Sequence, residues 1–170
     1  MIKYQRNKFT MLKSKNLSNK FLKFIKKNRL IIGIIFIFTC VLIVSALFIF
    51  VYQLINVEGN SMFPTLKNGQ QIFINNVKKP QRNDVVVFKY KDKILIKRLV
   101  GIPGDKLEVT ENSILINDEL VANFTDLGFW KFNGVIPEGK FFALGDNINF
   151  SNDSRTFGFF DLNDIKGVWA

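Results

Sequence analysis

A run of 28 residues without a charged side chain, Leu30 to Val57, constrains the fold of this 170-residue chain more than any other feature. As an α-helix, this run extends roughly 42 Å at about 1.5 Å per residue, and the hydrocarbon core of a bilayer is about 30 Å thick. A secretory signal has a shorter apolar core, whereas this one continues through Phe48 to Val51. We therefore predict an uncleaved transmembrane helix over residues 30–57.

The charged residues are distributed unevenly along the chain. Residues 1–29 contain ten basic and no acidic residues, whereas residues 30–170 contain 14 of each sign. Because basic residues beside a transmembrane helix stay in the cytoplasm, we predict a cytoplasmic basic segment over 1–29 and an extracytoplasmic domain over 58–170. The protein is then a single-pass protein of the cell membrane, and its neutral domain is not expected to bind nucleic acid.

The partner expected for the basic segment is the lipid bilayer, through anionic lipid. Apolar residues recur among its lysines at roughly helical spacing from Phe9 to Ile25. This pattern suits a basic amphipathic helix over 9–29 that lies on the lipid surface. A disordered basic tail fits the same residues, and the sequence does not choose between the two.

Residues 58–170 show the pattern of a mostly β domain. Short apolar runs alternate with Gly, Pro and Asn residues, which is typical of strands joined by tight turns. We expect a small antiparallel β-barrel or sandwich. The predicted elements are strands over 71–74, 84–90, 93–100 and 140–144, a hairpin over 107–121 that turns near Asn117 and Asp118, and a helical turn within 161–167.

Two residue counts limit the chemistry that this chain can perform. It has no His, which excludes Ser-His and Cys-His catalysis and removes the commonest ligand of transition metals. It has one Cys, Cys40, which excludes an intramolecular disulfide and a cysteine zinc site. We expect no metal and no cofactor, and a nucleophilic enzyme built from this chain must use a Lys or a carboxylate as its base.

Two residues suit that chemistry. Lys97 lies in an otherwise apolar predicted strand next to Arg98, and both burial and a neighbouring cation lower the pKa of an ammonium group. A neutral lysine accepts a proton and acts as a general base near neutral pH. Ser61 precedes Pro64 in a predicted rigid turn, exposed to an incoming chain. Taken alone, Ser61 also fits an ordinary serine in a turn, and Lys97 an ordinary solvated lysine on a strand. Together they describe a nucleophile and its base.

A third segment, residues 145–158, is dense in polar side chains. It follows an apolar strand and includes Asp146, Ser151, Asp153 and Arg155. Such a loop either orients a catalytic group or satisfies its own polar groups in a turn network. Its residues alone do not distinguish these two interpretations.

Four segments occur in an order that resembles a known family. They are VEGNSMFPTL (57–66), PQRNDVVVF (80–88), IKRLVGIPGD (96–105) and GDNINFSNDSRTFG (145–158). This order is similar to that of bacterial type I signal peptidase, a membrane-anchored Ser/Lys protease that removes signal peptides from exported proteins. The resemblance covers nearly all of residues 57–168, and the short insert over 106–139 resembles the short form of Gram-positive bacteria.

The resemblance implies a role for each residue of the candidate site. Ser61 matches the nucleophile of the family and Lys97 matches its general base. The implied function is cleavage of preproteins after small residues of the Ala-X-Ala type, with signal peptides as substrates and a mostly antiparallel β fold. The remaining matches are the orienting residue Ser151, the supporting residues Asp153 and Arg155, and the substrate-groove residue Met62.

Several positions differ from the family pattern, and two of them bear on the candidate site. Gly59 stands where some members have a Ser of the oxyanion hole, which leaves the backbone N–H of Ser61 as the donor. Ile148 stands where the family usually has Arg, which leaves the ion pairing of this loop open. Two other functions fit the same residues: a dedicated maturation protease of one secretion or conjugation system, and a non-catalytic membrane-tethered relative that binds signal peptides.

Overall fold

The structure, a computed structural model, describes residues 20, 23, 26–125 and 130–170. The chain divides into two compact units between Phe48 and Ile49, and we describe each by itself. The basic segment for which the sequence allows an amphipathic helix or a disordered tail lies largely outside the described residues.

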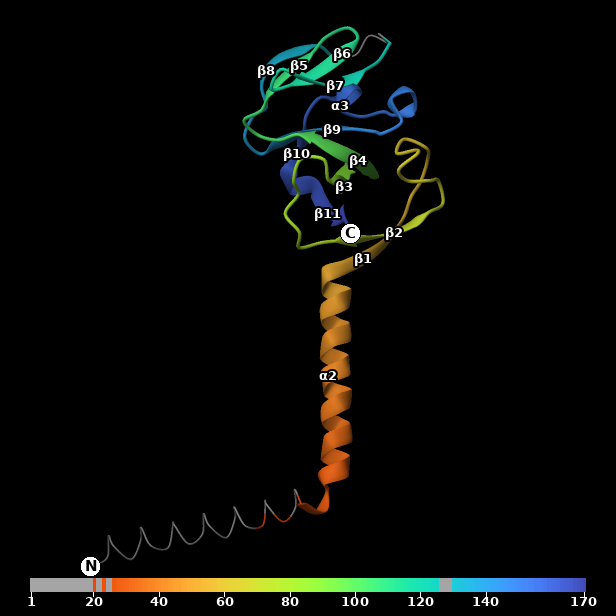
Figure 1. The fold of residues 1–170 in the computed structure, drawn as a ribbon, viewed down its shortest axis with the longest axis vertical. Coiled ribbons are helices and arrows are strands. Elements are labelled where there is room, and N and C mark those ends of the chain that lie inside the picture. Colours follow the sequence, from red (N-terminus) through yellow and green to blue (C-terminus); the bar gives the residue numbers. More distant parts are fainter. Residues whose placement is uncertain (1–19, 21–22, 24–25, 126–129) are drawn as a thin grey trace, which may run out of the picture. The chain divides into compact units, whose positions relative to one another are not determined.

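The first unit is dominated by the apolar helix α2, Arg29–Val51 (Figure 1). None of its residues is buried, and its length and composition suit a membrane-spanning helix. The predicted end of the helix at residue 57 is wrong, because α2 ends at Val51 and Tyr52–Asn56 form strand β1. The whole run lacks charge, but its last part pairs as a strand with residues 71–75, and Ile55 packs against the apolar core of the second unit.

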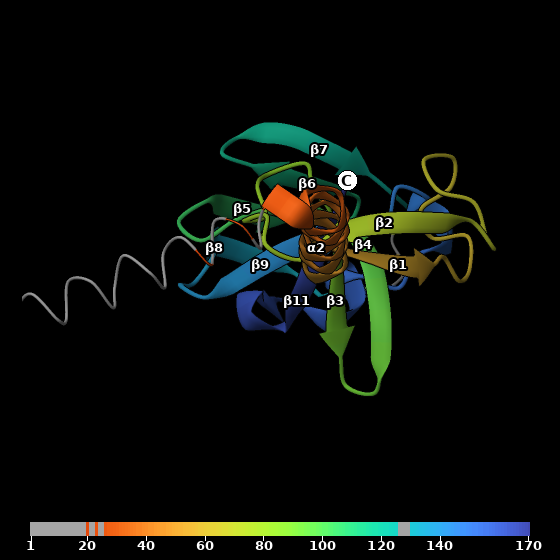
Figure 2. The ribbon, with the colours of Figure 1, turned by 90° about the horizontal axis from the view of Figure 1, so that it is seen from below.

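The second unit consists of two antiparallel sheets. The larger sheet contains β1, β2 (Gln71–Asn75), β3 (Val85–Tyr90), β4 (Lys93–Gly101), β9 (Lys140–Leu144), β10 (Phe160–Asp161) and β11 (Ile165–Trp169). The smaller sheet contains β5 (Lys106–Val109), β6 (Ser113–Ile116), β7 (Glu119–Asn123) and β8 (Phe132–Val135). Their strand orders are β1-β2-β11-β3-β4-β9-β10 and β7-β6-β5-β8. The expected mostly β antiparallel fold is confirmed, as a sandwich-like pair of sheets rather than a closed barrel (Figures 1 and 2).

Buried apolar side chains join the two sheets. Val100 of β4 and Phe142 of β9 pack against Leu107 and Ile116 of the smaller sheet. A second cluster, rich in phenylalanine, covers the larger sheet around Phe88. Strands β3, β4 and β9 are therefore fixed by apolar packing, and they hold the segments that carry the candidate site.

Several local predictions are confirmed and two are refined. Positive φ angles of 53° and 66° at Asn117 and Asp118 form the predicted hairpin turn, which joins β6 to β7. The strand predicted before that turn is two strands, because the Thr110 hydroxyl accepts a hydrogen bond from Ser113 N–H and stabilises a further turn. The predicted helical turn is limited to Leu162–Asp164, and the residues after it form β11.

The phenylalanine cluster gives a stability prediction. Phe88 is fully buried, and its ring centroid lies 5.1 Å from that of Phe141 and 4.6 Å from that of Phe160. Phe88→Ala leaves a cavity, so we expect the free energy of unfolding to fall by about 3–5 kcal/mol in denaturant titration. The control Phe150→Ala removes a ring that is 75% exposed and should change stability little. Equal losses in the two variants would contradict this account of the core.

Candidate active site

Ser61 lies in the turn between β1 and β2. Backbone hydrogen bonds between Val57 and both Gly69 and Gln70, each 2.8 Å, close the base of this turn. The loop that follows β9 holds its tip, because the N–H of Asn147 donates to the carbonyl of Ser61 at 3.0 Å. The position of the serine is therefore set by residues that are distant in sequence.

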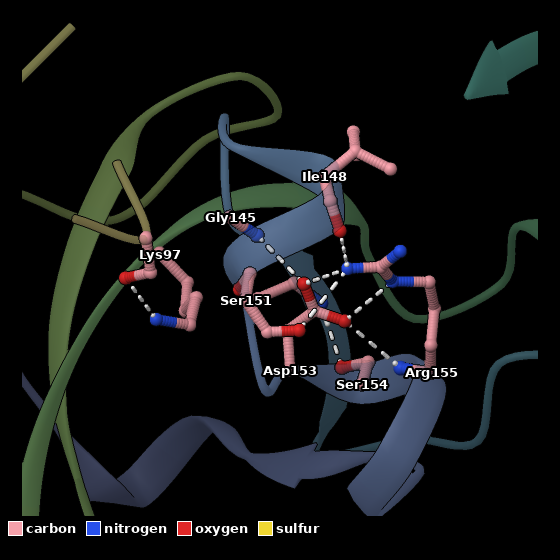
Figure 3. Close-up of polar contacts among 9 residues, drawn as sticks. Lys97, Gly145, Ile148, Ser151, Asp153, Ser154 and Arg155 are labelled. Atoms are coloured by element: carbon pink, nitrogen blue, oxygen red, sulfur yellow. Dashed lines mark hydrogen bonds and ion pairs between the residues drawn. The ribbon is translucent and has the colours of Figure 1, made fainter. Parts of the chain in front are cut away.

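Lys97 on β4 reaches the serine from the sheet. Its ammonium nitrogen Nζ lies 2.8 Å from the Oγ of Ser61 and 3.0 Å from the carbonyl oxygen of Ile96, and the residue is only 4% exposed. Figure 3 shows the second of these contacts. Burial lowers the pKa of Lys97 below its usual value, and the negative charge of Asp153 partly opposes this shift.

Arg98 does not act on Lys97 as the sequence suggested. Successive side chains of a strand point to opposite faces, and Arg98 instead forms two hydrogen bonds to Asp146, of 2.7 and 2.6 Å. Burial raises the pKa of Asp146, but hydrogen bonds from Arg98 and Thr65 outweigh it and hold that pKa below its usual value. The neighbouring cation is thus neutralised, and burial is the main cause of the lowered pKa of Lys97.

Asp153 and Arg155 form a fully buried ion pair under the loop after β9 (Figure 3). Both Nε and one terminal nitrogen of Arg155 donate to the carboxylate at 2.9 Å, and Gly145 N–H donates to it at 2.9 Å. Arg155 also donates to the carbonyl oxygen of Ile148 at 2.7 Å. The loop therefore has an intact ion pair although Ile148 stands where the family usually has Arg. Ile148 contributes its main-chain oxygen as a further acceptor for Arg155.

Ser151 lies against Gly145 next to the serine turn. A Cβ atom on Gly145 would overlap Ser151 Oγ and lie 2.5 Å from the carbonyl oxygen of Ser61, so only glycine fits here. The hydrogen bond from Ser151 to Lys97 implied by the resemblance is not formed: within the described part of the chain, the buried Ser151 Oγ has no hydrogen-bond partner. The orienting role of Ser151 stays a prediction.

Apolar residues form the floor beside the serine. Met62 is 1% exposed and packs in one cluster with Leu66 and Ile96. Its predicted place beside a substrate groove stays a prediction. The sequence interpretation missed Thr65 and Asn147, which link the serine turn to the loop after β9. Both lie inside the quoted motifs, and that location was the available signal.

The comparisons with known proteins identify the family. The sequence model described as "Signal peptidase, peptidase S26" matches residues 30–170. The chain belongs to this family of signal peptidases, as the order of its four motifs suggested.

Similar proteins come from Gram-positive bacteria. Signal peptidase IB of Staphylococcus aureus strain Mu50 is 32% identical over 167 residues, which cover 83% of this chain and 87% of that protein. Signal peptidase I P of Bacillus subtilis subsp. natto is 32% identical over 163 residues, covering 84% and 88%. The crystal structure of a signal peptidase I from Enterococcus faecalis V583 is 29% identical, covers 55% of this chain and 99% of that one, and superposes with a TM-score of 0.45.

The buried ion pair gives a second stability prediction. Arg155→Met removes the cation and leaves the carboxylate of Asp153 buried without it. We expect the free energy of unfolding to fall by about 3–5 kcal/mol, measured by denaturant titration. The control Glu111→Gln breaks an ion pair with Lys131 whose side chains are both more than half exposed, and its stability should be almost unchanged. A stable Arg155→Met protein would show that this pair does not hold the loop.

Proposed function

We propose that this chain is a membrane-bound serine endopeptidase that removes N-terminal signal peptides from exported preproteins by a dyad of Ser61 and Lys97. Membership of the signal peptidase family implies a serine protease that acts on signal-peptide-bearing preproteins. The observation that carries the finer assignment is the 2.8 Å contact between Lys97 Nζ and Ser61 Oγ at a lysine that is nearly fully buried.

The proposed reaction is acyl transfer to Ser61. Neutral Lys97 accepts the hydroxyl proton, and Oγ attacks the carbonyl carbon of the scissile bond. Lys97 then donates that proton to the leaving amine, the C–N bond breaks, and an ester to the serine remains. Lys97 next removes a proton from water, which hydrolyses the ester. Burial supports this role because it favours the neutral form of the base.

The backbone N–H of Ser61 is the proposed oxyanion donor. Among the described residues, none accepts a hydrogen bond from it, so it remains available to a substrate carbonyl. Gly59 has no hydroxyl to add, and its φ of 83° suits a glycine in this tight turn. The contact of Asn147 with the Ser61 carbonyl fixes the same peptide segment and supports a preorganised donor.

The edge of β4 offers a place for the signal peptide. Strand β9 pairs with β4 only from Arg98 onward, so within the described residues the edge of Lys93–Lys97 on that side has no strand partner. The β3–β4 hairpin projects beyond the neighbouring strands (Figure 2). An extended substrate that pairs there would reach Ser61 directly, and the apolar floor of Met62 and Ile96 suits small side chains of the Ala-X-Ala type.

The membrane arrangement is part of the proposal. We infer that α2 anchors the protein, with the basic segment before it in the cytoplasm near anionic lipid and the β domain on the extracytoplasmic side. The ten basic residues of 1–29 and the balanced charge of residues 30–170 support this orientation and give no reason for nucleic-acid binding. Ser61 would then lie where signal peptides emerge.

Removal of either dyad residue should abolish cleavage. We expect Ser61→Ala and Lys97→Met to lower kcat by about a thousandfold or more, assayed on a preprotein with the full chain in detergent. The matched controls are Ser113→Ala, a hydroxyl in the smaller sheet, and Lys89→Met, an exposed lysine on β3. Near-parental activity of either dyad variant rules out the dyad. Activity on a panel of unrelated preproteins separates a general signal peptidase from a dedicated maturation protease.

The rate should depend on pH through Lys97. Because the neutral lysine is the active form and its pKa is lowered, kcat/KM should rise with pH and level off below the range in which an exposed lysine loses its proton. Asp153→Asn removes the charge that opposes the shift, so the rise should move to lower pH. Asp164→Asn, at an exposed position, is the control and should leave the midpoint in place. A flat profile, or equal midpoints in all three proteins, contradicts a lysine base.

A further inference from the structure

The face of β4 opposite Lys97 borders a groove between the two sheets. Its volume is about 510 Å³, and it adjoins a hollow of about 290 Å³ that shares Asn83, Val100 and Val121 with it. One wall is the loop after β9, from Gly145 to Ile148, and the other is β7. All of these elements belong to the second unit.

The groove and the serine turn share a wall. On the serine side, Asn147 N–H holds the carbonyl of Ser61, and Gly145 lies close to the same oxygen. On the groove side, Gly145, Asp146 and Thr65 line the hollow, and Thr65 belongs to the serine turn itself. The loop after β9 therefore lies between the serine turn and the groove.

Strand β7 offers its backbone to the groove. It is the outermost strand of the smaller sheet, so within the described residues its outer edge has no strand partner. Three consecutive residues, Val121 to Asn123, line the groove. The register of β7 against β6 shifts between Leu120 and Ala122, so the alternation of faces is broken at Val121, and the three residues line the groove beside the unpaired edge of the strand. Unpaired backbone groups of this kind bind extended peptides.

The groove is electrically balanced. Its two charged residues, Arg98 and Asp146, neutralise each other through two hydrogen bonds. The remaining lining is apolar or carries neutral amide and hydroxyl groups, including Val100, Leu144 and Asn83. Such a surface selects neither acidic nor basic side chains, and a peptide would be held mainly through its backbone.

We propose that this groove binds the mature part of the substrate, the residues that follow the scissile bond, as an extended chain pairing with β7. This inference rests on the proposed function, since it needs a polypeptide cut at Ser61. The free edge of β4 ends at Lys97, so the chain beyond the cut must continue past the loop after β9. Mature regions differ in sequence between exported proteins, which suits recognition through the backbone.

Two substrates with one signal peptide and cleavage site test the proposal. The short substrate ends two residues after the scissile bond, and the long one continues through the mature protein. Val121→Lys places a long side chain in the groove at a position that is 40% exposed. We expect KM for the long substrate to rise about fivefold or more, with kcat retained and the short substrate unaffected.

Leu120→Lys is the matched control. Leu120 is 59% exposed on the same strand but lines neither hollow, so both substrates should be cleaved as by the parent. Asn123→Lys, at a second exposed groove position, should repeat the effect of Val121→Lys. The proposal is overturned if both groove variants change the two substrates equally or change neither. Failure of the proposed function is distinct, because the parent then cleaves neither substrate, and failure of the dyad alone leaves Ser61→Ala able to cleave both.

Discussion

The burial of the Lys97 ammonium group is the constraint on which the candidate site depends. An ammonium group has three N–H donors, and here it contacts one hydroxyl and one carbonyl oxygen. A buried charge with so few partners costs free energy, and the group lowers this cost by giving up its proton. The apolar strands β3 and β4 impose the burial, since Lys97 lies opposite Val86 in their register. The packing that forms the sheet thus also favours the neutral form of Lys97 that the proposed mechanism requires.

The surrounding charges are arranged so that they disturb Lys97 little. Arg98, its neighbour in sequence, is neutralised by Asp146 on the opposite face of β4. Asp153, which opposes the lowered pKa, is bound by Arg155 through two nitrogen atoms. Each carboxylate thus fixes a loop while its charge is balanced by an arginine.

The sequence predicted those features that depend on neighbouring residues. Apolar flanks indicated the burial of Lys97, and the residues at Asn117 and Asp118 indicated a hairpin turn that the structure contains. The end of α2 was misplaced because an uncharged run can form a strand of a sheet as well as a helix in lipid. The partner of Arg98 was missed because Asp146 is 48 positions away along the chain. Only the pairing of β4 with β9 brings the two side chains together.

Because successive side chains of β4 point to opposite faces, this one strand contributes both to the candidate site and to the groove. Lys97 points to the serine and Arg98 to the groove, and the loop after β9 lies between the two. If Asp146 were unpaired, its carboxylate would favour basic residues in any chain that entered the groove. Its ion pair with Arg98 removes this preference, and a separate hydrogen bond joins Asp146 to Thr65, four residues after the proposed nucleophile Ser61. The same carboxylate thus keeps the groove neutral and supports the turn that holds Ser61.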